Sequence, residues 1–355
     1  MGLFRARTEA TTPLEGIDAV FADLDGVVYA GAGSIPHAVD SLNRTKRERA
    51  VGYITNNASR SDASVAQHLA ELGLDVVPDD VVTSPQAAMT LLEERVEPGA
   101  LVFVVGGEGI VTELEKRGFR VTRSADDGPA AVVQGFAPEV GWRELAEASF
   151  ALNAHGGPDS DEPGIPWIAT NMDWTIPVAR GIAPGNGTLV SAVHTAVGRF
   201  PVVAGKPETP IFEEAKRRFG VERPLVVGDR LDTDILGANR AGMASAVVLT
   251  GIDRAKQVLA ADPASRPDFI TNIASRSDAS VAQHLAELGL EVVPDDVVTS
   301  PQAAMTLLEE RVDGRRVVIV SDGDGGLDLL RAACAAIWQS DTRIHALDVP
   351  ASLYS

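Results

Sequence analysis

Residues 17–26 read Ile-Asp-Ala-Val-Phe-Ala-Asp-Leu-Asp-Gly, a short apolar run that ends in two closely spaced acids. The run is typical of a buried strand, in which Asp23 and Asp25 point to the same side because side chains alternate with a period of two. Crowded carboxylates need a cation, and Mg²⁺ prefers oxygen ligands. One carboxylate is then free to attack an electrophile while the other handles protons. The alternative is a strand-ending turn, because Asp and Gly are also turn residues.

Further along the chain, short apolar runs alternate with helical patterns. After the second run, Val65, Leu69 and Leu72 share one face of a predicted helix. Ser61 is placed to cap its start and Gly73 to end it. Such alternation predicts βαβ units, and we therefore expect an α/β protein with a doubly wound parallel sheet.

A second α/β series follows from residue 81 to residue 200 and predicts an inserted domain. Its predicted strands are 101–105, 131–133 and 167–169, and its predicted helices lie around 87–96, 109–117 and 142–153. Strands of the first series are expected to resume at 201–204 and 225–227.

The second apolar run, 51–54, ends in Thr55, Asn56 and Asn57. A hydroxyl and two amides at a strand end can donate hydrogen bonds to phosphoryl oxygens. The same residues are ordinary turn and helix-cap choices, so taken alone they favour the simpler interpretation.

Two later strand ends also carry charged side chains. Lys206 follows the run 201–204, and Asp229 follows the run 225–227 with Asp234 shortly after it. Each has a simpler interpretation, a solvated turn lysine or helix-capping acids. In open α/β sheets, however, ligands bind beyond the carboxyl ends of the strands, and these strand ends together supply what phosphoryl transfer requires.

Composition restricts the classes of function. The chain of 355 residues is 45% hydrophobic but only 5% aromatic, and its formal charge of -19 argues against broad binding to nucleic acid or to anionic membranes. Cys334 is the only cysteine, so an intrachain disulfide is excluded and a reducing compartment is expected. Neither a signal peptide nor a spanning apolar segment is recognisable, and we expect a cytoplasmic protein.

One feature departs from ordinary domain organisation: residues 270–312 repeat residues 54–96, with differences only at Asn57 against Ile273 and at Asp75 against Glu291. Structural repeats diverge where folding does not constrain them, so this identity indicates a recent duplication or an artefact of sequence assembly. The copy has no acid pair before it, and we expect no second active site there.

These motifs together resemble those of the haloacid dehalogenase superfamily. The resemblance covers residues 17–250 and rests on Asp23-Leu-Asp-Gly, Thr55-Asn, Lys206 and Gly228-Asp with Asp234. Residues 170–173 (Thr-Asn-Met-Asp) and 184–187 (Pro-Gly-Asn-Gly) resemble cap sequences of its class IIA branch, which includes p-nitrophenyl phosphatases and glycerol 3-phosphate phosphatases. Met172 stands where the branch usually has proline.

The resemblance implies a role for each matched residue. Asp23 is expected to be the nucleophile and a Mg²⁺ ligand, Asp25 the general acid and base that also offers the ion its backbone carbonyl, and Asp229 the remaining protein ligand. Asp234 is expected to support the metal-bound waters and Lys206. The phosphoryl oxygens are expected to contact Thr55, Asn56, Asn57 and Lys206.

The resemblance also implies a Rossmann-like core, residues 1–80 and 200–262, an inserted α/β cap of the C2 type, residues 81–199, and a C-terminal extension, residues 263–355. The cap is expected to close over a small phosphomonoester and to choose it. The candidate specificity residues are Asn171, Asp173, Arg180, Gly185 and Asn186.

We expect a Mg²⁺-dependent phosphomonoester hydrolase, with glycerol 3-phosphate as the first choice of substrate. Phosphoglycolate and aryl phosphates such as p-nitrophenyl phosphate come next. A catalytically silent phosphate-binding or sensor protein is the alternative of another class. A homodimer is compatible with the sequence, which gives no oligomeric state.

Overall fold

A computed structural model of the chain describes residues 13–154, 164–178 and 180–271. The described residues do not include the C-terminal extension from residue 272 onward. That part of the chain contains almost all of the repeat, the segments 317–320 and 327–338 in which a strand and a helix are predicted, and Cys334. Of the repeat, only Ile270 and Thr271 are described, and they belong to the last strand of a sheet.

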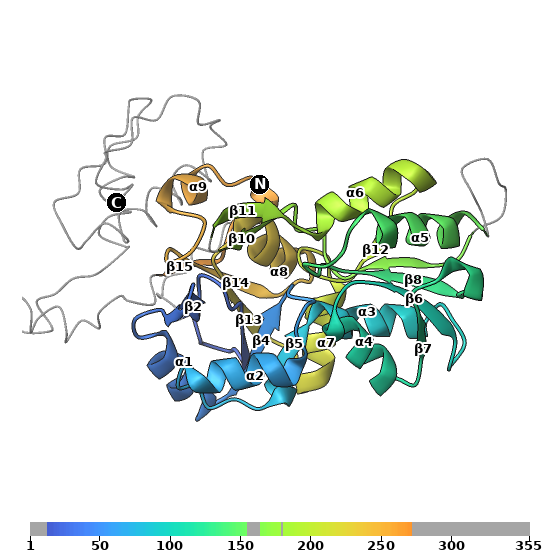
Figure 1. Ribbon diagram of the computed structural model, residues 1–355. Coiled ribbons are helices and arrows are strands. Elements are labelled where there is room, and N and C mark those ends of the chain that lie inside the picture. Colours follow the sequence, from blue (N-terminus) through green and yellow to red (C-terminus); the bar gives the residue numbers. More distant parts are fainter. Residues whose placement is uncertain (1–12, 155–163, 179, 272–355) are drawn as a thin grey trace, which may run out of the picture.

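The larger sheet has six parallel strands in the order β15-β14-β13-β1-β4-β5 (Figure 1). They are β1 (Ala19–Ala22), β4 (Ala50–Thr55), β5 (Val81–Thr83), β13 (Pro224–Gly228), β14 (Ala244–Val248) and β15 (Phe269–Thr271). Helices α1 (Ala38–Lys46), α2 (Asp62–Glu71), α7 (Pro210–Phe219), α8 (Leu236–Arg240) and α9 (Ala255–Leu259) accompany it. We call this unit the core lobe.

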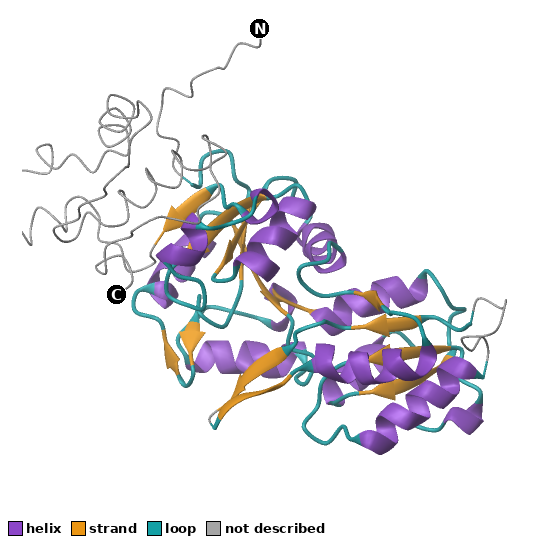
Figure 2. Cartoon of the chain, turned by 90° about the horizontal axis from the view of Figure 1, so that it is seen from above, coloured by secondary structure: helices purple, strands orange, loops and turns teal. Residues whose placement is uncertain are grey.

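The smaller sheet has five parallel strands in the order β12-β9-β8-β6-β7. They are β6 (Leu101–Val105), β7 (Arg120–Thr122), β8 (Ala131–Gln134), β9 (Trp167–Ala169) and β12 (Val202–Val203), with helices α4 (Glu108–Lys116), α5 (Trp142–Asn153) and α6 (Asn186–Val197) and the antiparallel hairpin β10 (Thr175–Val178) and β11 (Gly181–Pro184). We call this unit the cap lobe. Figure 2 shows the two lobes side by side.

Short elements complete the described residues. A two-stranded ribbon, β2 (Tyr29–Ala30) and β3 (Gly33–Ser34), follows the acid pair. Three 3-10 turns are η1 (Pro78–Asp80), η2 (Ala125–Asp127) and η4 (Pro263–Ser265), and η3 (Leu231–Ile235) is a π-helical turn that leads into α8.

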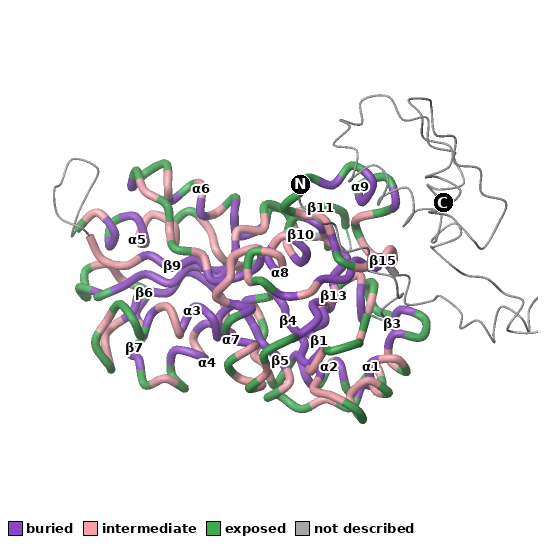
Figure 3. Tube along the Cα trace, turned by 180° about the vertical axis from the view of Figure 1, so that it is seen from behind, coloured by how far each residue is buried: buried purple, intermediate pink, exposed green. Residues whose placement is uncertain are grey.

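Alternation of side chains explains why both faces of the larger sheet are covered. Phe21 and Ile54 pack in the cluster that contains α7, whereas Ala22 and Tyr53 pack in the cluster that contains α1 and α2. The strands are accordingly buried along their length (Figure 3). The prediction of an α/β protein with doubly wound parallel sheets is confirmed.

The predicted helix after the second strand is also present. Ser61 accepts a hydrogen bond from the N–H of Ser64 at 3.3 Å and so caps α2, and Val65 and Leu69 are buried. Gly73, with φ of 98°, follows its last turn because this left-handed conformation is open to glycine.

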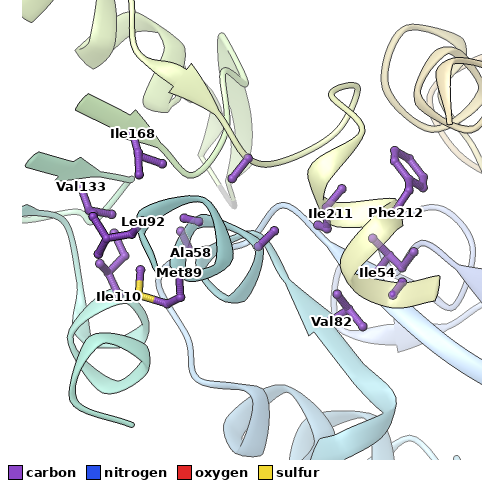
Figure 4. Packing of buried hydrophobic residues seen from close by; sticks show 14 of the residues in the cluster. Ile54, Ala58, Val82, Met89, Leu92, Ile110, Val133, Ile168, Ile211 and Phe212 are labelled. Atoms are coloured by element: carbon purple, nitrogen blue, oxygen red, sulfur yellow. The ribbon is translucent and has the colours of Figure 1, made fainter. Parts of the chain in front are cut away.

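Helix α3 (Ser84–Glu93) joins the two lobes. Met89 and Leu92 of α3 lie in one apolar cluster with Ile211 of the core lobe and with Ile110 and Ile168 of the cap lobe (Figure 4). The lobes therefore share a continuous core beside α3 rather than meeting through a polar linker.

Strand pairing corrects both predicted limits of the cap. Residues 81–83 were assigned to the cap but form β5, which pairs with β4 in the larger sheet. Residues 201–204 were assigned to the core, but Val202 and Val203 form β12, which pairs with β9 in the smaller sheet. Both strands are short, and the sequence gives no information on which sheet offers them a partner. Residues 263–271 were assigned to the C-terminal extension, but Phe269–Thr271 form β15, which pairs with β14 in the larger sheet. The predicted division otherwise stays a prediction.

Among the described residues, no helix combines the length and the apolar composition needed to cross a lipid bilayer.

Candidate active site

The candidate site lies where β1, β4 and β13 reach their carboxyl ends. Asp23 follows β1 directly, and its N–H donates to the carbonyl of Val227 in β13 at 2.8 Å. Asp234 lies in η3, after β13. The ammonium of Lys206 lies 2.5 Å from Oδ1 of Asp23 and 2.7 Å from Oδ1 of Asp234, and Lys206 is only 4% exposed. The pattern of acids at neighbouring strand ends thus brings these side chains together in space.

Lys206 reaches this edge from an unexpected direction. It follows β12, which belongs to the smaller sheet, so its strand is not one of those that carry the acids. The expectation that Lys206 ends a strand of the larger sheet is therefore wrong. Its proximity to Asp23 depends on how the two lobes pack.

Asp229, the first residue after β13, completes a cluster of carboxylates. One oxygen from each of Asp23, Asp229 and Asp234 lies within 4.8 Å of the others. Asp229 is 2% exposed, and its Oδ2 accepts a hydrogen bond from the N–H of Ile252 at 2.6 Å. The side chain is seated between two glycines, because a Cβ on either Gly26 or Gly251 would overlap it.

These carboxylates fit a divalent cation with oxygen ligands. Both oxygens of Asp234 are already bonded, Oδ1 to Lys206 at 2.7 Å and Oδ2 to the N–H of Arg230 at 3.2 Å, which leaves Asp23 and Asp229 as the carboxylates best placed to hold the ion. Three acids against one ammonium leave negative charge uncompensated. Mg²⁺ suits such a set because it is bound by few carboxylates and keeps several waters.

The pKa values of these groups reflect the crowding. Burial raises the pKa of Asp23, and the neighbouring charges of Asp234 and Asp229 add to this against the opposing effect of Lys206. Burial, helped by Asp234, raises the pKa of Asp229 to about 6. Burial lowers the pKa of Lys206, but Asp23 and Asp234 outweigh it and the net pKa is raised. A bound cation counteracts the like-charge repulsion that raises the pKa of both acids.

Asp25 is more open than these residues and lines the same cavity as Asp23. The pKa of Asp25 is raised because its carboxyl group is partly shielded from water by the surrounding residues. Lys206 and a hydrogen bond from the Tyr29 hydroxyl oppose this rise. A carboxyl group with a raised pKa beside a cavity suits exchange of protons with a bound molecule. Tyr29 was not singled out in the sequence, which gave no sign of its contact with Asp25.

The polar residues at the end of β4 and directly after it divide into two kinds. Thr55 is 4% exposed, lines the cavity, and accepts a hydrogen bond from the N–H of Asn57 at 3.1 Å. Asn57 is exposed, lines the cavity and accepts from the N–H of Ser59 at 2.9 Å. The side-chain amide of Asn56 instead bonds to the main chain of Lys206 and to Asp173, and it therefore does not offer the expected donor to a phosphoryl group.

The cavity has a volume of about 550 Å³ and runs between the two lobes. On the cap side, Asn171, Asp173 and Asn186 line it, whereas Gly185 and the exposed Arg180 are not among the described residues that do. Burial raises the pKa of Asp173.

Gly185 and Asn186 hold the residues on the cap side of the cavity in place. The side chain of Asn186 donates to the carbonyl of Asn171 at 2.7 Å, and the N–H of Gly185 donates to the carbonyl of Trp174 at 2.8 Å. A Cβ on Gly185 would overlap the carbonyl of Asp173. The loop that carries Asp173 is thus held against the start of α6.

Gly251 and Ile252, which seat Asp229, were missed in the sequence. A signal was available, because they follow β14 and β14 lies beside β13 in the sheet, so the strand-end argument applies to them as well.

The chain is similar to known hydrolases. A haloacid dehalogenase-like hydrolase family model matches residues 20–120 and 247–333, and a HAD-hydrolase-like model matches residues 203–275. The D-glycerol 3-phosphate phosphatase of Mycobacterium tuberculosis is 39% identical over 331 residues, which span 91% of this chain and 86% of that protein. Human chronophin is 34% identical over 284 residues, 76% of this chain and 93% of its own.

The chain belongs to the haloacid dehalogenase-like hydrolase family. Among solved structures, glycerol phosphate phosphatase from M. tuberculosis in complex with magnesium superposes with a TM-score of 0.73 at 37% identity, covering 92% of each chain. The p-nitrophenyl phosphatase from Archaeoglobus fulgidus has a TM-score of 0.65 at 28% identity, covering 72% of this chain and 96% of its own. The resemblance to this family is confirmed.

Proposed function

We propose that this chain is a Mg²⁺-dependent phosphomonoester hydrolase in which Asp23 is the nucleophile. The observation that carries the proposal is the convergence of Asp23, Asp229 and Asp234 around Lys206 at one sheet edge. The magnesium in the structure of the tuberculosis relative supports the choice of ion. When bound by Asp23 and Asp229, the ion neutralises charge on the phosphoryl group.

In the first step, a carboxylate oxygen of Asp23 attacks phosphorus and the bond from phosphorus to the ester oxygen breaks. The ammonium of Lys206, beside Asp23, stabilises negative charge on the transferring group. Asp25 transfers its proton to the leaving alkoxide. The products of this step are the free alcohol and an aspartyl-phosphate on Asp23.

In the second step, water attacks the phosphorus of the aspartyl-phosphate. Asp25, now ionised, accepts a proton from this water, the bond from phosphorus to Asp23 breaks, and inorganic phosphate leaves. Asp23 and Asp25 both line the cavity and Asp25 is the more exposed of the two, which suits an exchange of protons with alcohol and water.

Glycerol 3-phosphate is the substrate that we propose. The name of the tuberculosis relative supports it. On the cap side, the cavity is lined by Asp173 and by neutral residues such as Asn171, Thr175 and Ile176. Such a wall suits a neutral leaving group with hydroxyls better than one that carries a carboxylate.

The ion pair between Arg230 and Asp232 supports the same choice of substrate. Arg230 lines the cavity, but its guanidinium is bonded to Asp232 at 3.0 and 2.8 Å. A carboxylate on the leaving group, as in phosphoglycolate, would have to compete with Asp232 for this cation. Aryl phosphates carry no such group and stay the next alternative, and a cytoplasmic location and a homodimer stay predictions.

The test is phosphate release from p-nitrophenyl phosphate with and without Mg²⁺, by the wild-type chain and by Asp23→Asn. We expect turnover that needs Mg²⁺ and that is lost in the variant. Phosphate binding without turnover by the wild type would instead support the silent binding protein. Glycerol 3-phosphate and phosphoglycolate, compared by kcat/KM, then decide the substrate, and a preference for phosphoglycolate would contradict the argument from Arg230.

A further inference from the structure

The side-chain amide of Asn56 bonds to both polar groups of one main-chain residue. Its Oδ1 accepts a hydrogen bond from the N–H of Lys206 at 2.8 Å, and its Nδ2 donates to the carbonyl of Lys206 at 3.0 Å. Two bonds from one planar amide fix both the position and the direction of the backbone that they hold. The residue held in this way is the one whose ammonium lies between Asp23 and Asp234.

The chain just before Lys206 is shaped to this contact. A Cβ on Gly205 would lie 2.5 Å from Oδ1 of Asn56 and 2.5 Å from the carbonyl of Thr170, distances that real Cβ atoms do not show. Glycine therefore lets the backbone pass close to the amide. The side-chain amide of Asn56 is in close contact with the backbone at Gly205, so a displacement of the amide also displaces Lys206.

The cap lobe holds Asn56 from the other side. The carboxylate of Asp173 accepts a second hydrogen bond from Nδ2 of Asn56 at 3.0 Å, and the side chain of Asn171 donates to the carbonyl of Asn56 at 2.8 Å. Asn171 also accepts from the N–H of Asp173 at 3.2 Å, and the N–H of Gly187 in α6 donates to the carbonyl of Asp173 at 2.9 Å. The loop at 171–173 is thus fixed within the cap lobe and bonded to Asn56.

We propose that Asn56 is a positioning residue, through which Asn171 and Asp173 of the cap lobe set the place of the Lys206 ammonium. Its side-chain amide acts on the reaction through Lys206 and, being bonded to Lys206 and Asp173, does not itself bind the phosphoryl group. Its consequence for catalysis rests on the proposed phosphatase function, whereas its effect on Lys206 does not.

Steady-state kinetics with p-nitrophenyl phosphate test the catalytic consequence. Asn56→Ala should lower kcat by about 10- to 100-fold, because small displacements of a reacting group are costly. Asp173→Ala, which removes one of the bonds that hold the amide, should lower kcat by about fivefold. Asp173→Asn keeps an acceptor oxygen, and its kcat should therefore be close to that of the wild type. The double variant Asn56→Ala with Asp173→Ala should be no slower than Asn56→Ala alone, because both changes act on one contact.

Asn43 offers a matched control. Its side-chain amide also bonds to two main-chain groups, the carbonyl of Gly73 at 2.9 Å and the N–H of Asp75 at 2.8 Å, but it lies on α1 and does not line the cavity. Asn43→Ala should lose stability as Asn56→Ala does and keep kcat within about twofold of the wild type.

A second measurement does not depend on turnover. The chain has lysines only at 46, 116, 206, 216 and 256, so ¹⁵N labelling of lysine gives few ammonium signals, and that of Lys206 is identified by its loss in Lys206→Arg. A buried ammonium held by two carboxylates exchanges its protons slowly. In Asn56→Ala and Asp173→Ala this signal should shift and exchange faster, and in Asn43→Ala it should not.

The outcomes separate the two proposals. A wild type without turnover contradicts the phosphatase, and the ammonium signal still decides the role of Asn56. An active wild type with an unimpaired Asn56→Ala, or a Lys206 signal unchanged in that variant, contradicts the role of Asn56 alone. A rise in KM at unchanged kcat, with Asp173→Ala like the wild type, would show direct substrate binding by Asn56 and also overturn it. If Asn56→Ala does not fold, the two Asp173 variants decide instead. Equal kcat values for Asp173→Ala and Asp173→Asn would then contradict the positioning role of Asn56.

Discussion

Replacing Gly251 by alanine tests whether Asp229 must lie where it does. A Cβ at position 251 would overlap Oδ2, Cγ and Cβ of Asp229 together, inside the 3.0 Å that real Cβ atoms keep from their neighbours, and ordinary contact begins at 3.4 Å. Because the overlap includes the Cβ of Asp229, a change of rotamer does not relieve it. The carboxylate must therefore retreat by about 1 Å or more, since closely packed interiors leave no void to absorb the new methyl group.

The magnitude follows from the chemistry of the ion. Mg²⁺ holds its ligands at about 2.0–2.1 Å in near-octahedral geometry, so a carboxylate that retreats by half this length no longer ligates it properly. Misplacement of about 1 Å in an active site costs about 100-fold in rate. We expect Gly251→Ala to lose about 100-fold in kcat/KM, which corresponds to about 2.7 kcal/mol of transition-state stabilisation, and to need more Mg²⁺ for half-maximal activity.

The assay is hydrolysis of p-nitrophenyl phosphate over a Mg²⁺ titration. Gly33→Ala is the matched control, because no atom of the described residues lies within 4 Å of a Cβ built at that position and Gly33 is not among the glycines with positive φ. We expect the control to match the wild type in kcat/KM and in the Mg²⁺ midpoint. A Gly251→Ala variant that is folded and as active as Gly33→Ala, with the same midpoint, would refute the assignment of Asp229 as a ligand.

Three further outcomes are expected. Mg²⁺ at about 100 times its dissociation constant should stabilise the folded chain by about 2.7 kcal/mol in thermal melts, and Asp229→Asn should abolish most of this shift. Asp25→Asn should slow hydrolysis of glycerol 3-phosphate by about 100-fold or more but that of p-nitrophenyl phosphate less, because nitrophenolate leaves without a proton, and equal losses would contradict its role as an acid. Burial raises the pKa of the Asp173 carboxyl group above its unfolded value of 3.8, so the folded state binds the carboxyl proton more tightly than the unfolded state does. The folded state therefore loses stability as the pH rises from about 3.8 through the raised pKa. In urea unfolding at a series of pH values, the stability of Asp173→Asn relative to the wild type should therefore increase from about pH 4 upward, and a constant difference would contradict the shift.

Much of the candidate site was predictable because its residues follow strands. Asp23, Asp229 and Thr55 each stand at or directly after the carboxyl end of a strand of the larger sheet, and parallel strands bring those ends to one edge whatever their order in the sheet. The contacts that hold Asp229 in place were only partly predictable. Gly251 and Ile252 follow β14, so the sequence could place them at the same edge of the sheet, but no local pattern marks the contact of either residue with Asp229.

The sequence by itself determined the local elements and the chemistry available at their ends: an apolar run with two acids, a capped amphipathic helix, and further acids after another strand. Only the tertiary structure decided that β12 pairs in the smaller sheet, that Lys206 nevertheless reaches Asp23, and that the amide of Asn56 holds the backbone of Lys206. The physical reason is range. Strand and helix patterns follow from neighbours a few residues apart, whereas a hydrogen bond between Asn56 and Lys206 joins groups 150 residues apart and exists only once both lobes have packed around one core.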